Sequence, residues 1–204
     1  MRILNSKAIL SALTVLALSA TVTSCNILEK DTVEPVAQTD PDGYRTFTIA
    51  KNNHYADNRG NEQVNTEKLS FVVLFDSSAV YKTKDPVNQY DINKLYGLSD
   101  CNAAHHTNSA RMGWTWNHNQ LEIHAYGYKN GQRNSEFITA IPIGEPVNMS
   151  IEMHDSTYLM RVEDKFAELP RGCTGNGLGY KLFPYFGGDE TAPHNVVIKI
   201  KELK

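Results

Sequence analysis

Two neighbouring segments decide the fold of this chain: SARMGWTW at residues 109–116 and QLEIHAYGY at residues 120–128, joined by the polar residues NHN. In each segment the side chains fall on two faces with a period of two, which is the period of a β-strand. One face of the second segment holds Leu121, Ile123, Ala125 and Gly127, and the other holds Glu122, His124, Tyr126 and Tyr128. A row of carboxylate, imidazole and phenol groups on one strand face predicts the floor of a ligand groove.

The first segment also has two distinct faces, with Ala110, Met112, Trp114 and Trp116 on one and Arg111, Gly113 and Thr115 on the other. Because Met and Trp on the same strand face usually pack in a core, we expect the tryptophan face to be buried. Arg111 then points into the groove. Two alternatives remain: the tryptophans line the groove, or Arg111 and Glu122 form a cross-strand ion pair on a solvated sheet.

The remaining chain from residue 44 also has the pattern of short strands. Residues 44–51 alternate at Phe47 and Ile49, and the apolar run KLSFVVLFD at residues 68–76 predicts a central strand covered on both faces. Residues 83–108 predict a long ordered connection with a short helical turn at residues 91–96. The NG pair at residues 130–131 predicts a two-residue hairpin turn.

Further strands are expected at EFITAIPI, NMSIEMHD, TYLMRVED, FAEL, YKLFPYF and VVIKIKEL, between residues 136 and 203. We count about ten strands in residues 44–204 and find no convincing long helix. This pattern predicts one all-β domain, an antiparallel β-sandwich.

The N-terminal residues predict export. Residues 1–24 have the basic start and apolar run of a signal peptide. The sequence VTSC at residues 22–25 resembles the bacterial lipobox, which implies cleavage before Cys25 and acylation of its thiol by chains such as palmitate. An ordinary signal peptide followed by a chance cysteine is the alternative.

Residues 25–43 comprise this cysteine and a stretch without sustained apolar periodicity, which predicts a flexible tether. The sequence EKD at residues 29–31 resembles the signal that directs lipoproteins of Bacteroidetes-like bacteria to the outer face of the outer membrane. We therefore expect a lipid-anchored protein at the cell surface that contacts the membrane through its anchor only.

Charge and cysteine content narrow the expected partners. Cleavage would remove two of the 20 basic residues and none of the 23 acidic residues, which leaves a net charge of −5. A mildly acidic chain without basic clusters argues against nucleic acid as a partner. Cys101 and Cys173 are the cysteines that remain besides Cys25, and such a pair in an exported protein favours a disulfide. Two unpaired buried cysteines are the alternative.

Two stretches resemble concanavalin-like jelly rolls. TYLMRVEDKFAELPR at residues 157–171 resembles their unit of strand, tight turn, short strand and arginine. KLFPYFGGDETAPHNVVIKIKEL at residues 181–203 resembles the final strands of such domains in lipoproteins of gut Bacteroidetes. The resemblance covers residues 44–204 and implies a concanavalin-like jelly roll. It implies much less about activity.

The predicted groove favours a glycan or polysaccharide as the ligand. Sugars stack their C–H faces on aromatic rings, while polar side chains bind their hydroxyl groups. The expected ligand-binding residues are Asn108, Arg111, Glu122, His124, Tyr126, Tyr128 and Tyr180. The leading hypothesis is a lipoprotein that binds a glycan without catalysis.

A resemblance to jelly-roll polysaccharide lyases, the alginate lyases among them, gives an enzymatic alternative. These enzymes use an Arg, a Gln-x-His strand and a late-strand Tyr, which implies catalytic roles here for Arg111, His124 and Tyr185, with Tyr180 as the alternative tyrosine. The chemistry implied is β-elimination at a uronate. Glu122 stands where the family has Gln, and KLFPY at residues 181–185 departs from its Lys-x-Gly-x-Tyr pattern.

The spacing of metal-ligating residue types does not indicate a metal centre. His105 and His106 lie close to Asp100 and Cys101, but neighbouring histidines on an extended chain point apart, and no zinc-type spacing is present. We expect no cofactor, and a structural calcium ion is left open. The third functional hypothesis is a structural or adhesion module that binds protein.

Overall fold

The computed structural model describes residues 38–204. The predicted signal peptide at residues 1–24, the acylated Cys25 and most of the predicted tether lie outside the described residues. Within the part that is described, no helix is long and apolar enough to cross a membrane.

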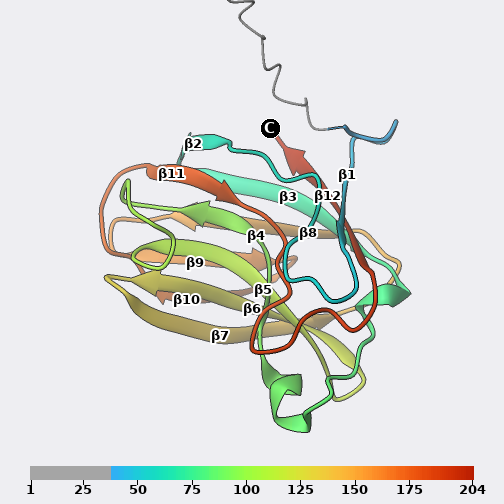
Figure 1. Ribbon diagram of the computed structural model, residues 1–204. Coiled ribbons are helices and arrows are strands. Elements are labelled where there is room, and N and C mark those ends of the chain that lie inside the picture. The colour runs from blue at the N-terminus through green and yellow to red at the C-terminus, as the bar shows by residue number, and fades with distance from the viewer. Residues whose placement is uncertain (1–37) are drawn as a thin grey trace, which may run out of the picture. The chain divides into compact units, whose positions relative to one another are not determined.

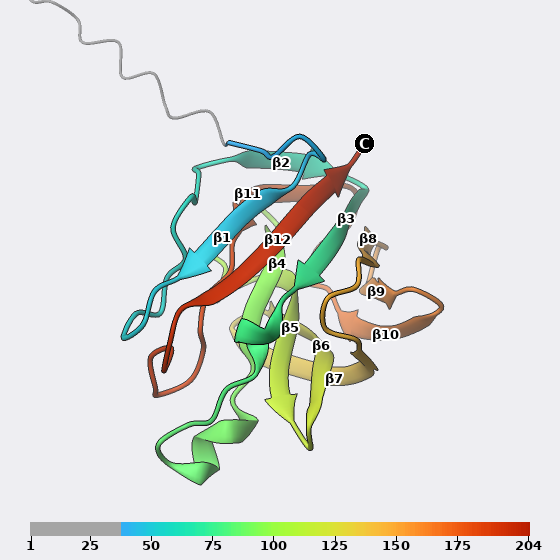
Figure 2. The same cartoon turned by 90° about the vertical axis from the view of Figure 1, so that its right-hand side faces the viewer.

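The described chain forms two six-stranded antiparallel sheets that lie in two layers (Figure 1). The first sheet has the order β1 (Arg45–Ile49), β12 (Val196–Leu203), β3 (Lys68–Phe75), β8 (Val147–Met153), β9 (Thr157–Val162), β10 (Lys165–Pro170). The second has the order β2 (Gln63–Thr66), β11 (Gly177–Leu182), β4 (Asn93–Ser99), β5 (Ser109–Asn117), β6 (Gln120–Lys129), β7 (Gln132–Ile141). The turned view in Figure 2 shows β1, β12 and β3 in front of the second sheet. The predicted antiparallel β-sandwich is confirmed.

The core between the sheets explains which face of β5 is buried. Ala110, Met112 and Trp114 are fully buried, and the Trp114 ring lies 5.3 Å from the ring of Phe75 in the opposite sheet. The prediction that the tryptophan face is buried is therefore confirmed for these three residues. Trp116, at the end of the strand, is only partly buried.

The predicted helical turn at residues 91–96 is wrong. The start of β4 occupies most of this range, and a short 3₁₀ helix, η2 (Pro86–Tyr90), precedes it. The register of β4 against β5 shifts between Lys94 and Gly97, and six of the seven strand residues are buried. A strand with an irregular register and two covered faces shows no clean alternation in its sequence.

The apolar run in β3 is buried less completely than its composition predicts. Leu69, Phe71, Val73 and Phe75 are buried, whereas the residues between them are partly exposed. The prediction of a strand covered on both faces is therefore wrong. The predicted hairpin turn at residues 130–131 is confirmed, because these residues connect β6 and β7.

The carboxylate of Asp100, directly after β4, joins four parts of the chain. The side chains of Asp100 and Arg171 are both fully buried, and Oδ2 of the aspartate lies 2.7 Å from Nε of the arginine. The Tyr158 hydroxyl on β9 donates a hydrogen bond to the same carboxylate at 2.8 Å, and the Leu178 N–H on β11 donates another at 3.0 Å. We call these four residues the Asp100 junction.

A disulfide between Cys101 and Cys173 closes the chain beside the Asp100 junction and confirms the predicted pairing. It connects the β4–β5 loop to the β10–β11 loop across a sequence separation of 72 residues. In the chain-entropy model, closing a loop of this length stabilises a fold by about 4 kcal/mol.

Asp100→Asn is expected to lower the free energy of unfolding by about 3–5 kcal/mol, because it leaves the buried Arg171 charge uncompensated. Burial raises the pKa of Asp100, but hydrogen bonds from Arg171 and backbone N–H groups outweigh burial and hold this pKa below its usual range. The contribution is therefore present above the unfolded pKa of about 4 and is lost as pH falls through the folded value.

Urea unfolding at several pH values measures this effect. Asp164→Asn is the matched control, because it removes an exposed ion pair with Lys165 and should change stability by less than about 1 kcal/mol. Equal effects of the two substitutions would contradict the importance of the Asp100 junction.

Candidate functional site

Arg111 lies near the middle of the second sheet, on the face that points away from the core. Its register partners are Gly97 on β4 and Tyr126 on β6. A Cβ atom at position 97 would lie 2.4 Å from the Cβ atom of Arg111, so only glycine leaves room for the arginine there. The arginine is 6% exposed even though it faces away from the core.

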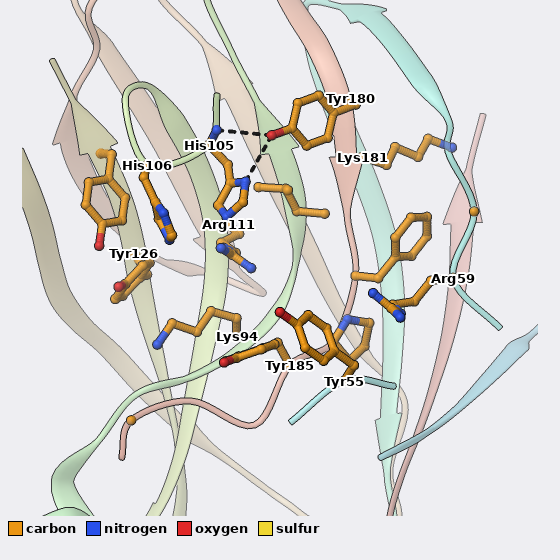
Figure 3. Close-up of a pocket in the computed structure, with 16 residues that line it drawn as sticks. Tyr55, Arg59, Lys94, His105, His106, Arg111, Tyr126, Tyr180, Lys181 and Tyr185 are labelled. Atoms are coloured by element: carbon orange, nitrogen blue, oxygen red, sulfur yellow. Dashed lines mark hydrogen bonds between the residues drawn. The ribbon is translucent and has the colours of Figure 1, made fainter. Parts of the chain in front are cut away.

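Arg111 lines a cavity of about 500 Å³. It is lined by Tyr55, Arg59, Gly60, Lys94, His105, His106, Arg111, Tyr126, Tyr128, Tyr180, Lys181, Leu182, Phe183, Pro184, Tyr185 and Gly188. Figure 3 shows Arg111 in the middle, with His105 and Tyr180 on one side and Lys94 and Tyr185 on the other. We call this space the Arg111 cavity.

One wall of the Arg111 cavity is formed by His105, His106 and Tyr180. The Tyr180 hydroxyl accepts a hydrogen bond from the His105 backbone N–H at 3.2 Å and lies 2.9 Å from Nδ1 of the same residue. The His106 ring lies 5.3 Å from the ring of Tyr128. Burial, reinforced by the charge of Arg111, lowers the pKa of His105 to about 4, so its imidazole is neutral at pH 7.

The opposite wall is formed by Tyr55 and Tyr185. Their ring centroids lie 4.9 Å apart in an edge-to-face arrangement, and the other face of Tyr185 stacks on His54 at 5.2 Å. The backbone N–H of Lys94 donates to the Tyr185 carbonyl at 2.8 Å, which ties this wall to β4. Burial raises the pKa of Tyr185, so its hydroxyl remains protonated at neutral pH.

The described residues place no counter-charge on the Arg111 guanidinium. It forms no salt bridge within residues 38–204, and its buried Nε has no hydrogen-bond partner there. Burial lowers its pKa to about 10, so the group still carries its charge at pH 7. Because a buried charge without acceptors costs free energy, an anion that enters the cavity gains by supplying them.

Lys94 brings a second cation close to Arg111. Its Nζ donates to the Ile92 carbonyl at 2.7 Å and lies 4.8 Å from the centre of the Tyr126 ring. Burial is the largest cause that lowers the pKa of Lys94 to about 8, and repulsion from Arg111 is the next. Both groups are positively charged at pH 7.

The two other cationic residues that line the cavity, Arg59 and Lys181, have partners within the protein. Nε of Arg59 donates to a backbone carbonyl at 2.8 Å, and its guanidinium covers the ring of Tyr55. Lys181 is neutralised by Glu62 at 2.9 Å and Glu202 at 2.6 Å. No carboxylate among the described residues lines the cavity. Its field is therefore positive around Arg111 and Lys94.

The structure brings five of the residues proposed from the sequence to this cavity: Arg111, Tyr126, Tyr128, Tyr180 and Tyr185. Glu122 and His124 share the outward face of β6 but lie further along the strand, outside the lining. Glu122 lies 3.1 Å from Nδ1 of His118 and 3.6 Å from Nε2 of His124. The alternative of an ion pair between Arg111 and Glu122 is therefore wrong.

Asn108 does not line the cavity. Its side chain is buried, and its Oδ1 accepts a hydrogen bond from the backbone N–H of Asn130 at 2.9 Å. Asn108 thus holds the β6–β7 turn. The ring of His124 packs edge-to-face against Phe137 at 5.7 Å.

Five lining residues are absent from the site proposed from the sequence: Tyr55, Arg59, Lys94, His105 and His106. Four of them come from loops, where no periodicity shows which way a side chain points. The sequence feature that could have indicated these four residues is the presence of a tyrosine, an arginine and two adjacent histidines in the loops. Lys94 was not predicted as a site residue because the sequence of β4 does not show the alternation of a strand.

Arg111→Met is expected to raise the pKa of Lys94 above its value of about 8, because the nearest like charge is removed. Reductive ¹³C-methylation of the lysines followed by an NMR pH titration measures this shift. The Lys94→Gln variant identifies the resonance by its loss. An unchanged Lys94 midpoint in Arg111→Met would contradict the repulsion between the two cations.

The sequence matches no protein-family model and no curated protein. Among solved structures, alginate lyase AlyC3 is similar, with a TM-score of 0.51 and 11% identity over 80% of this chain and 75% of that chain. A glycoside hydrolase family 16 endo-glucanase from Bacteroides ovatus has a TM-score of 0.47 and 10% identity over 81% of this chain and 84% of that one. At these identities the likeness concerns the fold alone, and that fold is a jelly-roll β-sandwich.

Proposed function

We propose that the protein binds an acidic glycan in the Arg111 cavity, as a non-catalytic module that Cys25 anchors in the outer membrane at the cell surface. The observation that carries the proposal is the unpaired, buried guanidinium of Arg111 in an open cavity walled by tyrosines. The anchoring rests on the N-terminal sequence.

The charge arrangement supports a carboxylate as the recognised group. A guanidinium presents a planar fork of donors that matches the two oxygens of a carboxylate. Arg111 offers this fork in a buried setting, where an ion pair is screened less by solvent than at the surface. Lys94 supplies a second positive charge beside it. A uronic acid is a sugar that carries such a carboxylate.

The walls support a sugar rather than a small organic acid. The exposed Tyr55 and the partly exposed Tyr128 and Tyr185 provide aromatic surface against which sugar C–H groups pack. Their hydroxyls donate to and accept from sugar hydroxyls. The volume of about 500 Å³ lies in the range typical of small-molecule sites.

The state of the imidazoles favours binding without turnover. An efficient general base has a pKa near the working pH. The pKa of His105, which lines the cavity, is about 4. The pKa of His124 is also lowered by burial, and this residue lies outside the lining. His105 lines the cavity but has a pKa far below the working pH, and His124 lies outside the cavity. Neither imidazole therefore combines the position and the pKa that a general base needs.

A polysaccharide lyase is the second candidate, and the contact between Tyr180 and His105 favours it. In β-elimination a base removes the C5 proton of a uronate, the C4–O bond breaks as a double bond forms, and an acid protonates the leaving oxygen. Arg111 would bind the carboxylate, with Tyr180 and His105 as the proton-transfer pair. His105 would then take the role that the sequence resemblance implies for His124.

Arg111→Met is expected to weaken binding of a hexauronate at least 30-fold, because losing one partner of a buried ion pair costs about 2 kcal/mol or more. The same substitution should leave the fold as stable or stabilise it by about 1–4 kcal/mol, because it replaces a buried unpaired charge by an apolar side chain.

Isothermal titration calorimetry with hexauronates and with neutral hexasaccharides measures the binding, and thermal unfolding measures the stability. Arg161→Met on the opposite sheet is the matched control and should bind like the wild type. Equal affinity of the wild type for acidic and neutral ligands would overturn the proposal of an acidic glycan.

The wild-type protein is expected to release no unsaturated product from uronate polymers, which is checked by ultraviolet absorbance of the new double bond. Product formation that Tyr180→Phe abolishes and His124→Ala preserves would establish the lyase instead. It would also place the chemistry on the His105 side of the cavity.

A further inference from the structure

We infer that Trp116 is the platform of a second sugar site, which stacks a neutral hexose ring at the end of the sandwich. This site is separate from the Arg111 cavity and shares no lining residue with it. It lies where the β5–β6 hairpin and η2 come together, at the end of the molecule that both Figure 1 and Figure 2 show lowest.

Trp116 differs from Trp114 although both lie on the same face of β5. Trp114 is fully buried between the sheets, whereas Trp116 packs on the rim of the core and is partly exposed. The indole Nε1 of Trp116 makes no hydrogen bond within residues 38–204 and is not among the buried atoms that lack a partner there. The group therefore reaches solvent and can donate to a ligand oxygen.

Two hollows meet at Trp116. The first has a volume of about 500 Å³ and is lined by Val80, Tyr81, Lys82, Gln89, Trp116, Asn117, His118, Asn119 and His194. The second has a volume of about 410 Å³ and is lined by Trp116, Asn119, Gln120, Leu121, Ala140, Ile141, Pro142 and Ile143. Because both hollows are lined by Trp116 and Asn119, a ligand that spans the two would contact these residues.

The surroundings of Trp116 suit a neutral, hydroxyl-rich ligand. Asn119 is exposed and makes no side-chain hydrogen bond within the described residues, and Asn117 uses only its Oδ1, which accepts from a backbone N–H. Amide groups donate to and accept from sugar hydroxyls without requiring charge on the ligand. No carboxylate of the described residues lines either hollow, and the one lysine of the lining, Lys82, is exposed to solvent.

The platform is held rigid before any ligand arrives. Nε2 of Gln89, on η2, donates to the Trp116 carbonyl at 2.6 Å, and its Oε1 accepts from the Thr83 N–H at 3.0 Å. On the other side, His118 and Asn119 have φ values of 49° and 58° and form the tight turn of the hairpin. The backbone that carries the indole is fixed in this way, so little backbone freedom is lost when a sugar stacks on the ring.

The two tryptophans of the chain make the proposal directly measurable, because only Trp116 is open to solvent. Iodide quenching of the fluorescence of the full-length protein reports the exposure of Trp116, and Trp116→Phe should remove most of this quenching. We expect cellobiose, lactose, mannobiose or N,N′-diacetylchitobiose at millimolar concentration to lower the quenching constant at least twofold in a saturable manner.

Two variants separate this site from the Arg111 cavity. Asn119→Gly should weaken the sugar protection several-fold and leave quenching without sugar unchanged, because it removes a side-chain amide that makes no structural hydrogen bond, and glycine tolerates the φ of 58° at this turn position. Arg111→Met should leave the protection intact even if acidic glycans no longer bind. Failure of all four disaccharides to protect Trp116 would overturn the inference, and so would protection that persists in Asn119→Gly but is lost in Arg111→Met.

Discussion

The buried ion pair between Asp100 and Arg171 is the interaction on which the Arg111 cavity depends. Asp100 directly follows β4, and Leu178, which donates to its carboxylate, lies on β11 only two residues before Tyr180. The same carboxylate therefore fixes the start of the loop that carries His105 and the strand that carries Tyr180. Tyr158 adds a contact to the opposite sheet. One charge thus aligns a wall of the site with the core of the sandwich.

Such a junction is costly to break and also costly to form, since both charges leave water. Here the cost is offset because each side chain has several partners. Arg171 also donates to the carbonyls of His154, Gly175 and Asn176, at 3.0, 2.6 and 3.0 Å. Arg111 presents the opposite case. It is buried to a similar degree, but the described residues offer its guanidinium neither a carboxylate nor an acceptor for Nε. The contrast separates an arginine that stabilises the fold from one whose charge the described residues leave uncompensated.

The sequence allowed the second sheet to be predicted where the strands alternate cleanly. The parity of β5 and β6 placed Trp114 in the core and Arg111 on the opposite face, and the cysteine count suggested the disulfide. The prediction failed where geometry is decided by long-range contacts. Gly97 lies close to Arg111, and the register of β4 shifts between Lys94 and Gly97. The sequence of β4 therefore lacks a regular alternation, so neither this strand nor the position of Lys94 was predicted. Similarly, nothing local to His105 indicates that it meets Tyr180, which lies 75 residues away.

The charge distribution reconciles an acidic chain with a cationic cavity. Lys181 at the edge of the cavity is neutralised by Glu62 and Glu202, so the positive field does not extend along β11. It is concentrated instead at Arg111 and Lys94, which repel each other and are held together by the fold. The chain as a whole has a net negative charge, and this charge disfavours non-specific contacts with polyanions away from Arg111 and Lys94. Under the proposed function, a polyanionic glycan would be attracted at one position, where its carboxylate would relieve the repulsion between Arg111 and Lys94.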